Sequence, residues 1–187
     1  MHELYQQILQ ALQMEDKEQA VKLSMDALEN KHVTVMELYE SILSPALASI
    51  INEYEDEGDL IWKEHVRSAI IRTIIESAYP YILKEQAPVM GERENVIVMC
   101  PELEDHELGA KMVSDFFQIA GFNSYFIGAR TPLKTIVNAI KDVTNSDLTF
   151  ILGGRAIDAN PDSVKNTGAH IHLRNFEDIQ QLIEVEK

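Results

Sequence analysis

Hydrophobic spacing divides the chain into two halves of different character. Up to about residue 85, apolar residues recur at every third or fourth position, which is typical of amphipathic helices. From residue 95 onward, short apolar runs alternate with helical stretches, as in a parallel sheet whose strands are joined by helices. The stretch 86–94 contains Pro88 and Gly91 and has no clear period, so it is predicted to be a linker between domains 1–85 and 95–187.

The first half predicts an antiparallel four-helix bundle, because its helical segments are joined by short connections. Thr34 is expected to cap the third helix, with Glu37 at the capping-box position. Pro45 lies inside that helix and is expected to kink or interrupt it. The fourth helix is expected to run from about Leu60 to Leu83. The breaks between the helices are predicted at Met14–Asp16, Asn30–His32 and Glu53–Asp59.

The second half predicts a Rossmann-like, flavodoxin-like α/β domain with a doubly wound parallel sheet. Val96–Met99 is entirely apolar, which indicates a strand buried on both faces. Gly121 is expected to end the first helix and Asn175 to cap the last. The expected strands are Val96–Met99, Asn123–Ile127, Leu148–Leu152 and His170–Leu173, and the expected helices are Leu108–Ala120, Thr131–Val143, Asn160–Asn166 and Phe176–Val185.

Composition limits the classes of partner. The 187 residues are 45% hydrophobic and 25% charged, as in an ordinary soluble globular protein. A net charge of −15 argues against direct binding to nucleic acid or to an anionic membrane, and leaves plain solubility or a basic partner protein. No apolar run approaches the roughly 18 residues of a membrane span. The start of the chain lacks the features of a signal peptide, so a cytoplasmic location is expected.

The strongest candidate chemistry lies in the segment Glu104–Gly109, directly after the first strand. His106 would stand on a loop at a strand end, where it could ligate a metal. Glu104 could hold the other ring nitrogen and set its tautomer, and Gly109 could let a large ligand approach. The pattern is short and leaves open a solvated acidic loop with an incidental histidine.

The other cysteine and histidine residues suggest no second site. Cys100, the single cysteine, is expected to be a buried small residue rather than a reactive thiol, and it excludes an intramolecular disulfide. His32, His170 and His172 have no partners at metal-ligand spacing and are interpreted as structural.

Several segments together resemble the cobalamin-binding module shared by methionine synthase, corrinoid proteins of methyltransferase systems and light-sensing cobalamin-dependent repressors. A helical bundle followed by a doubly wound domain is the order of domains in that family. The resemblance covers nearly the whole chain. It is carried by Glu104–Gly109, by Gly121–Gly128 with Thr131–Leu133 after it, by Leu152–Ala156, and by Glu64–His65 on the fourth bundle helix.

The resemblance implies that the doubly wound domain binds cobalamin and that the helical bundle covers it. His106 would replace the cofactor's own base as the lower ligand of cobalt, within the acidic motif of Glu104 and Asp105. The glycines of the strand ends would line the slot for the displaced nucleotide tail; these are Gly109, Gly128, Gly153 and Gly154. Bundle residues would cover the upper face of the cobalt; these are Glu64, His65 and an aromatic residue, either Tyr54 or Trp62.

Alternatives remain open for two of the bundle residues. Trp62 could be an ordinary residue of the bundle core, and Glu64 a solvated helix position. The form of the cofactor, adenosyl-, methyl- or hydroxocobalamin, is also open.

Two departures from the family pattern affect the prediction. Glu104 replaces the usual Asp, and the Glu107–Leu108 pair after the histidine is more similar to the sensor branch than to the methyl carriers. A strand and a helix that the family has before the Gly-Gly strand are missing, since only Thr144–Asp147 intervene. The sheet is therefore expected to have about four strands and a partly open tail slot.

Three functions follow from these observations. The first is a cobalamin-dependent sensor or regulatory module that acts on a partner protein and is not itself an enzyme. The alternative is a corrinoid methyl-carrier subunit that works with methyltransferases. A further alternative is an interaction module that has lost the cofactor. Assembly into a homo-oligomer is possible in each case.

Overall fold

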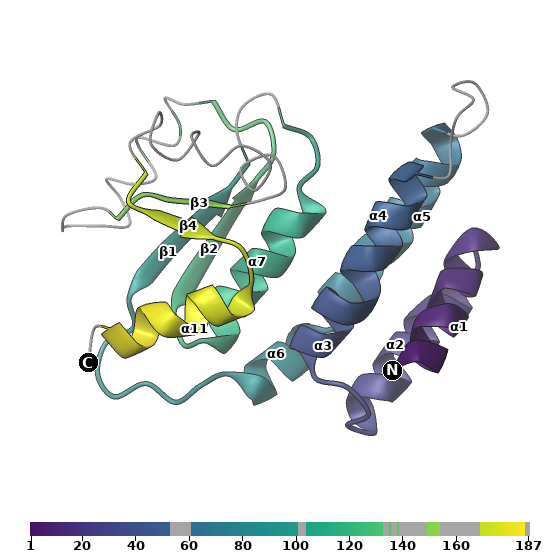
Figure 1. The fold of residues 1–187 in the computed structure, drawn as a ribbon, viewed down its shortest axis with the longest axis horizontal. Helices are drawn as coiled ribbons and strands as arrows, with labels where there is room; N and C mark the ends of the chain where they lie inside the picture. Colours follow the sequence, from purple (N-terminus) through teal and green to yellow (C-terminus); the bar gives the residue numbers. More distant parts are fainter. Residues whose placement is uncertain are drawn as a thin grey trace. The chain divides into compact units, whose positions relative to one another are not determined.

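A computed structural model describes residues 1–52, 61–100, 104–132, 135, 138, 149–153 and 169–185 of the chain. The chain divides into two compact units, Met1–Gln86 (unit 1) and Ala87–Lys187 (unit 2). Unit 1 is helical, and unit 2 combines parallel strands with helices, as the hydrophobic pattern predicts (Figure 1). No helix in the described part of the chain is long and apolar enough to cross a lipid bilayer.

Unit 1 is built from helices that share one apolar core. Its elements are α1 (His2–Gln13), α2 (Lys17–Glu29), α3 (Val35–Leu38), the π-helical turn η1 (Tyr39–Leu43), α4 (Ser44–Asn52), α5 (Ile61–Ser77) and α6 (Tyr79–Glu85). The largest of its fully buried side chains come from α1, from the α3–η1 segment, from α5 and from α6. Tyr39 is among them, and its hydroxyl donates to the Ile75 carbonyl at 3.2 Å, so that η1 is tied to α5.

Local capping defines where two of these helices begin. The Asp16 side chain caps α2 by accepting from the Gln19 amide at 3.0 Å. The predicted capping box of α3 is present. The Thr34 hydroxyl accepts from the Glu37 amide, and a Glu37 carboxylate oxygen accepts from the Thr34 amide at 2.8 Å.

Pro45 interrupts the helical pattern of unit 1. Pro45 has no amide hydrogen to donate to the carbonyl four residues before it. The helix adapts by widening into η1 just before that position, where the Ser44 amide donates to the Tyr39 carbonyl five residues back. The irregularity expected at Pro45 is thus a π turn.

The prediction of one continuous fourth helix is wrong. α5 ends at Ser77 and α6 begins at Tyr79, with Pro80 in its first turn. Pro80 cannot donate to the carbonyl four residues back, but its ring suits the start of a new helix. The Ala78 amide between the two helices donates to the Ile74 and Ile75 carbonyls.

The described residues of unit 2 form four short strands that pair in parallel. They are β1 (Asn95–Met99), β2 (Asn123–Gly128), β3 (Ile151–Gly153) and β4 (Ile171–Leu173). In the described residues β1 pairs with β2 and β3 with β4, and no strand ladder joins the two pairs. The β1–β2 register shifts after Val98, so that Met99 lies opposite Gly128. β1 was expected to be buried, but its residues are only half-buried or exposed, since β2 is its one described neighbour in the sheet.

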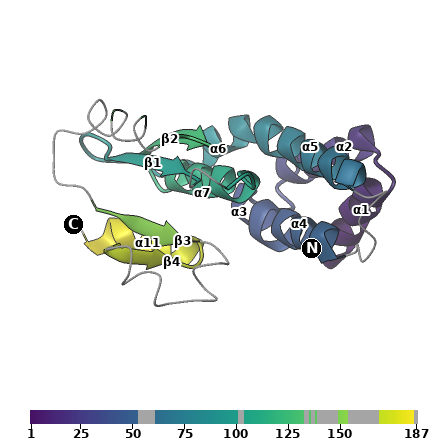
Figure 2. The ribbon, with the colours of Figure 1, turned by 90° about the horizontal axis from the view of Figure 1, so that it is seen from above.

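Two helices of the described residues, α7 (Leu108–Ile119) and α11 (Phe176–Val185), pack with these strands. α7 contacts β1 and β2, and α11 contacts β4 and α7 (Figure 2). The rings of Phe116 and Phe176 meet edge to face with centroids 5.0 Å apart. Gly121 follows α7 with a φ of +106°, as a helix-ending glycine requires, and the Asn175 side chain caps α11 by accepting from the Asp178 amide.

Some predicted elements fall outside the described residues. They include the helix Asn160–Asn166, most of the helix Thr131–Val143, the connection Thr144–Asp147 and the first residue of the predicted strand Leu148–Leu152.

The predicted linker is held by contacts at its start. In unit 1, both carboxylate oxygens of Glu85 lie 3.1 Å from the Val35 amide, at the start of α3. In unit 2, the Ala87 amide donates to the Ile119 carbonyl at 2.7 Å. Gln86 is therefore the single residue between these two attachments. A Cβ atom at Gly121 would come within 2.6 Å of Val89, so the glycine also lets the linker pack against the end of α7.

Replacing Glu85 with alanine should destabilise unit 1 by about 1 kcal/mol, because the Val35 amide loses its side-chain acceptor. Glu85→Gln keeps an acceptor, and its stability at neutral pH should equal or exceed that of the wild type. The reason is that burial raises the pKa of Glu85 and thus disfavours its charged form in the folded state. Urea unfolding of the three proteins measures the difference. Equal midpoints for Glu85→Ala and the wild type would contradict the capping role.

Candidate functional site

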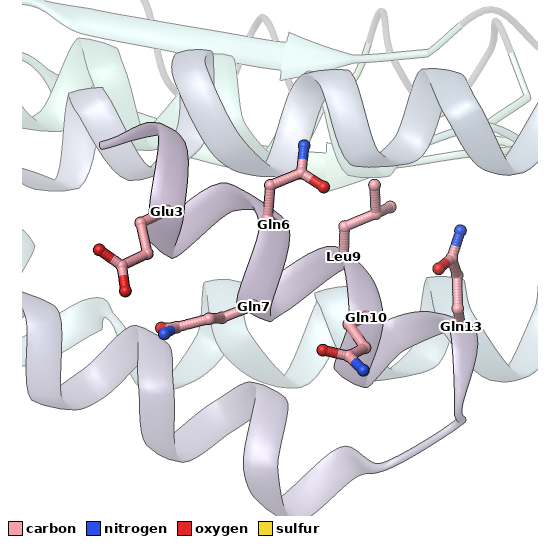
Figure 3. A pocket seen from close by; sticks show the side chains of 6 residues that line it. All are labelled: Glu3, Gln6, Gln7, Leu9, Gln10 and Gln13. Atoms are coloured by element: carbon pink, nitrogen blue, oxygen red, sulfur yellow. The ribbon is translucent and has the colours of Figure 1, made fainter.

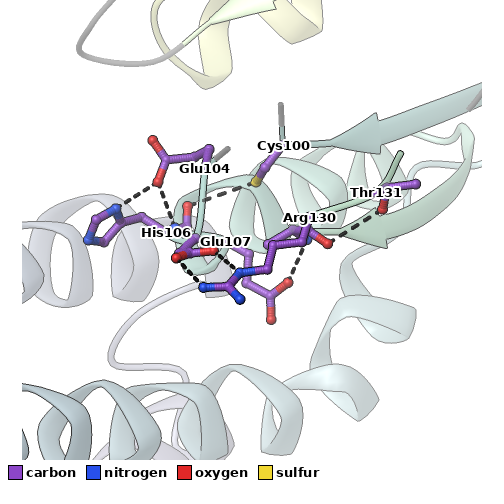
Figure 4. Close-up of polar contacts among 8 residues, drawn as sticks. Cys100, Glu104, His106, Glu107, Arg130 and Thr131 are labelled. Carbon is purple, nitrogen blue, oxygen red and sulfur yellow. Dashed lines mark hydrogen bonds and ion pairs between the residues drawn. The ribbon is translucent and has the colours of Figure 1, made fainter. Parts of the chain in front are cut away.

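The candidate site is the loop between β1 and α7. β1 and β2 run parallel, so the loops at their carboxyl ends lie at the same edge, the usual place for ligands in α/β sheets. The Cys100 amide extends the pairing by donating to the Gly128 carbonyl at 3.1 Å. Residues 104–107 therefore lie beside residues 128–131, as Figure 4 shows.

Glu104 holds His106 through two hydrogen bonds to a single oxygen. Glu104 Oε1 lies 2.7 Å from the His106 amide nitrogen and 2.7 Å from Nδ1 of the ring. These bonds, the one from the backbone amide being the larger effect, hold the pKa of Glu104 below its usual range. An ionised carboxylate can only accept, so Nδ1 carries the proton, and the neutral form of the ring presents its lone pair at Nε2. The contact expected from the sequence spacing is thus present.

The imidazole of His106 is open to a ligand. Its side chain is 79% exposed, and the ring points away from Cys100 and Arg130 (Figure 4). Among the described residues no group of three or more His, Cys, Asp or Glu side chains could hold a metal ion. A single imidazole donor does not make a site for a bare ion. It suits a metal whose other ligands arrive with an organic cofactor.

The two acidic neighbours of His106 are bound to the loop after β2. Asp105 forms a two-pronged ion pair with Arg130, in which Nη2 lies 2.6 Å from Oδ2. This pair lowers the pKa of Asp105 and raises that of Arg130. Glu107 Oε2 accepts from the Ala129 amide at 2.8 Å.

Sequence reasoning missed Arg130 and the role of Glu107. The two loops are separated by more than twenty residues in sequence, and no local pattern links them. The parallel pairing of the two strands was the one available signal, since it places residues 104–107 and 128–131 at the same edge.

The three described glycines of the predicted tail slot have different surroundings. A Cβ atom at Gly109, in the first turn of α7, would meet nothing within 4 Å. Gly128 has a φ of +90°, and a Cβ there would lie 2.8 Å from Glu107 Oε2. A Cβ at Gly153 would lie 2.8 Å from the Leu173 carbonyl oxygen. Local packing therefore accounts for Gly128 and Gly153, whereas only Gly109 faces open space. Gly154 lies outside the described residues.

The predicted residues of the upper face lie on α5 in unit 1. His65 Nε2 is 3.5 Å from Glu64 Oε2, and Glu64 Oε1 also accepts from the Ser68 hydroxyl at 3.1 Å. Trp62 is 55% exposed, so it is not a residue of the bundle core. Tyr54 lies outside the described residues, and the upper-face role of this group stays a prediction.

Cys100 is buried, as expected from its place after an apolar strand. Its Sγ lies 3.9 Å from the His106 carbonyl oxygen. Burial, reinforced by Glu104 and Glu107, raises the pKa of the Cys100 thiol. The thiol is therefore neutral near pH 7 and is not an activated nucleophile.

A hollow on unit 1 offers no comparable chemistry. Its described lining comes entirely from α1 and consists of Glu3, Gln6, Gln7, Leu9, Gln10 and Gln13 (Figure 3). Amide groups predominate there, with one carboxylate and no imidazole or thiol. The loop after β1 remains the better candidate.

Comparison with known proteins supports the fold. No protein-family model and no curated protein matched the sequence. Among solved structures, the chain is similar to the monomethylamine corrinoid protein of Methanosarcina barkeri, with a TM-score of 0.76 and 12% identity over 97% of each chain. A second similarity, to the methanol:cobalamin methyltransferase complex of the same organism, has a TM-score of 0.44 and 16% identity over 98% of this chain and 79% of that one. The first similarity shows a shared fold along nearly the whole chain, and the second is too low to support an argument.

Gly128 and Gly109 should respond in opposite ways to alanine. Gly128→Ala should destabilise the protein by about 1–3 kcal/mol, because it combines a positive φ with a collision at Glu107. Gly109→Ala should be neutral or stabilise by up to about 1 kcal/mol, since alanine favours the helix and meets no neighbour. Urea unfolding of both variants checks the contrast. Equal losses of stability would contradict it.

Proposed function

We propose that this chain binds a corrinoid, with His106 as the lower ligand of cobalt, and acts as a methyl carrier for methyltransferases. The observation that supports this most is the state of His106 at the carboxyl end of β1. Its Nδ1 is held by Glu104, its Nε2 lone pair is available, and its side chain is 79% exposed.

The donor set fits a corrinoid better than a free metal ion. When bound, a corrinoid would supply a cobalt ion that can take up and release a methyl group, together with most of the ligands of that ion. The protein would then need to supply only one further donor, and His106 offers one. Glu104 keeps the Nδ1 proton in a short hydrogen bond, which makes the ring a stronger donor through Nε2.

Two roles remain, which are to admit the nucleotide tail of the corrinoid and to cover its upper face. Gly109 and α5 have surfaces that suit them. The open space at Gly109 would admit the nucleotide tail of the corrinoid next to the start of α7. On α5, Trp62, His65 and Val66 are exposed at helical spacing and form one mixed apolar and polar face. We assign that face, together with Glu64, to the cover over the upper side of the corrinoid.

We place the methyl-carrier role before the sensor role for two reasons. The similar structure that spans nearly the whole chain is, by its name, a monomethylamine corrinoid protein, and corrinoid proteins of methyltransferase systems are the branch to which the predicted methyl carrier belongs. Glu107, one of the residues that favour a sensor by resemblance, has a local task because its carboxylate accepts from the Ala129 amide. The Glu64–His65 pair, which resembles a pair of the light-sensing branch, and Leu108 are the sequence features that still favour a sensor.

The partner proposed for this function is a methyltransferase, and the chain itself is a carrier rather than the catalyst. With a net charge of −15, the chain favours a partner with a basic docking surface and fast, salt-sensitive association.

His106→Ala should remove imidazole ligation from the loaded protein. Wild-type protein incubated separately with hydroxo-, methyl- and adenosylcobalamin and then desalted should retain corrinoid with the absorbance of a histidine-ligated form. The variant should shift toward the spectrum of a corrinoid without imidazole. His32→Ala, which removes an exposed histidine of unit 1, is the matched control and should resemble the wild type. An unchanged His106→Ala spectrum would show that another group ligates the cobalt.

Gly109→Ala should weaken hydroxocobalamin binding about tenfold or more while the corrinoid-free protein keeps its stability. The added methyl group would occupy space that the ligand needs, and about 1.4 kcal/mol of overpacking corresponds to a tenfold change in Kd. Equilibrium titration followed by absorbance measures the affinity. Wild-type affinity in this variant would remove Gly109 from the site.

Three further outcomes separate the functions. Transfer of the methyl group from the methylcobalamin-loaded protein to a thiol acceptor in the presence of a methyltransferase supports the carrier. A light-induced change of oligomer size in the adenosylcobalamin-loaded protein, without such transfer, would replace the carrier by a sensor. If no corrinoid survives desalting, the chain is an interaction module.

A further inference from the structure

The loop that carries His106 is attached to the end of β2 on both sides of the histidine. Before it, Asp105 pairs with Arg130; after it, Glu107 accepts from the Ala129 amide at 2.8 Å. The two partners are consecutive residues of the loop after β2. His106 itself points away from this contact zone, as Figure 4 shows. The attachments thus restrain the backbone around His106 without engaging its imidazole, whose Nδ1 is held by Glu104.

The loop after β2 is shaped to receive Glu107. Gly128 has a φ of +90° and Arg130 a φ of +54°, so the backbone turns sharply on either side of Ala129. A Cβ at Gly128 would come within 2.8 Å of Glu107 Oε2. The glycine therefore makes room for the carboxylate, and the turn presents the Ala129 amide to it. This fit between the two loops does not require a ligand.

The two attachments differ in strength. Glu107 is half-buried and accepts from a backbone amide. Its burial partly shields this hydrogen bond from competing water. The side chains of Asp105 and Arg130 are 55% and 75% exposed, and exposed ion pairs contribute little. Glu107 is therefore expected to dominate the restraint on the loop.

We infer that Glu107 is a positioning residue that sets the place of His106 at the carboxyl end of β1 through its contact with the Ala129 amide. This inference rests on the proposed function, since the position of His106 has a consequence only if its Nε2 ligates cobalt. Glu107 needs no contact with the corrinoid for this role. Asp105 and Arg130 are a secondary support for the same loop.

The test compares Glu107→Ala with Glu107→Gln, in which the amide oxygen can still accept from Ala129. Glu92→Ala, the loss of an exposed glutamate outside the loop, is the matched control for charge. In corrinoid-free protein, amide hydrogen exchange at Ala129 should accelerate about tenfold or more in Glu107→Ala and stay near the wild-type rate in the other two. Exchange at Phe116 and Phe117 in α7 should remain slow in every variant, which verifies that unit 2 is folded.

The second measurement uses hydroxocobalamin-loaded protein. Glu107→Ala should lower the fraction with imidazole-ligated absorbance, and Glu107→Gln should restore it. Unchanged exchange at Ala129, or accelerated exchange with full ligation, overturns the positioning role. Failure of the wild type to retain hydroxocobalamin overturns the proposed function, and the positioning role with it. That outcome is recognised without any variant. If Glu107→Ala does not fold, loss of ligation in folded Glu107→Gln, with slow exchange at Ala129, still overturns the inference.

Discussion

The parallel pairing of β1 with β2 determines where every group of the candidate site lies. It begins at Asn95 and Asn123 and shifts register so that Met99 meets Gly128. Because both strands end at the same edge, the loops that follow them come within hydrogen-bonding distance of each other. α7 covers the pair and begins directly after the histidine loop, so the loop is held by the strand before it and the helix after it.

Charge repulsion is the second constraint on this loop. Glu104, Asp105 and Glu107 place three carboxylates within four residues, which would repel one another without nearby donors. Each carboxylate has its own donor. Glu104 accepts from the amide and ring of His106, Asp105 from the Arg130 guanidinium, and Glu107 from the Ala129 amide. The donors keep the acidic loop ordered, and one of them is the imidazole that the proposed function uses.

Prediction from sequence was most successful where local chemistry decides structure. The capping box at Thr34, the helix-ending Gly121 and the cap at Asn175 all follow from side-chain groups that satisfy nearby backbone atoms. The continuous fourth helix was wrong because Pro80 outweighed an uninterrupted apolar period. The half-buried state of β1 was also missed, since apolar residues predict burial without specifying how many strands lie alongside.

The contact between Glu104 and His106 could be predicted from the sequence, because the two residues are only two positions apart on one loop. The sequence by itself also determined the order of a helical unit and a parallel α/β unit, since hydrophobic periodicity is a local property of the chain. The tertiary structure alone decided that Glu107 and Asp105 bind the loop after β2, that Gly128 makes room for a carboxylate, and that Gly109 faces open space. Those contacts depend on the register between β1 and β2, and register arises from pairing between distant segments that no local pattern specifies.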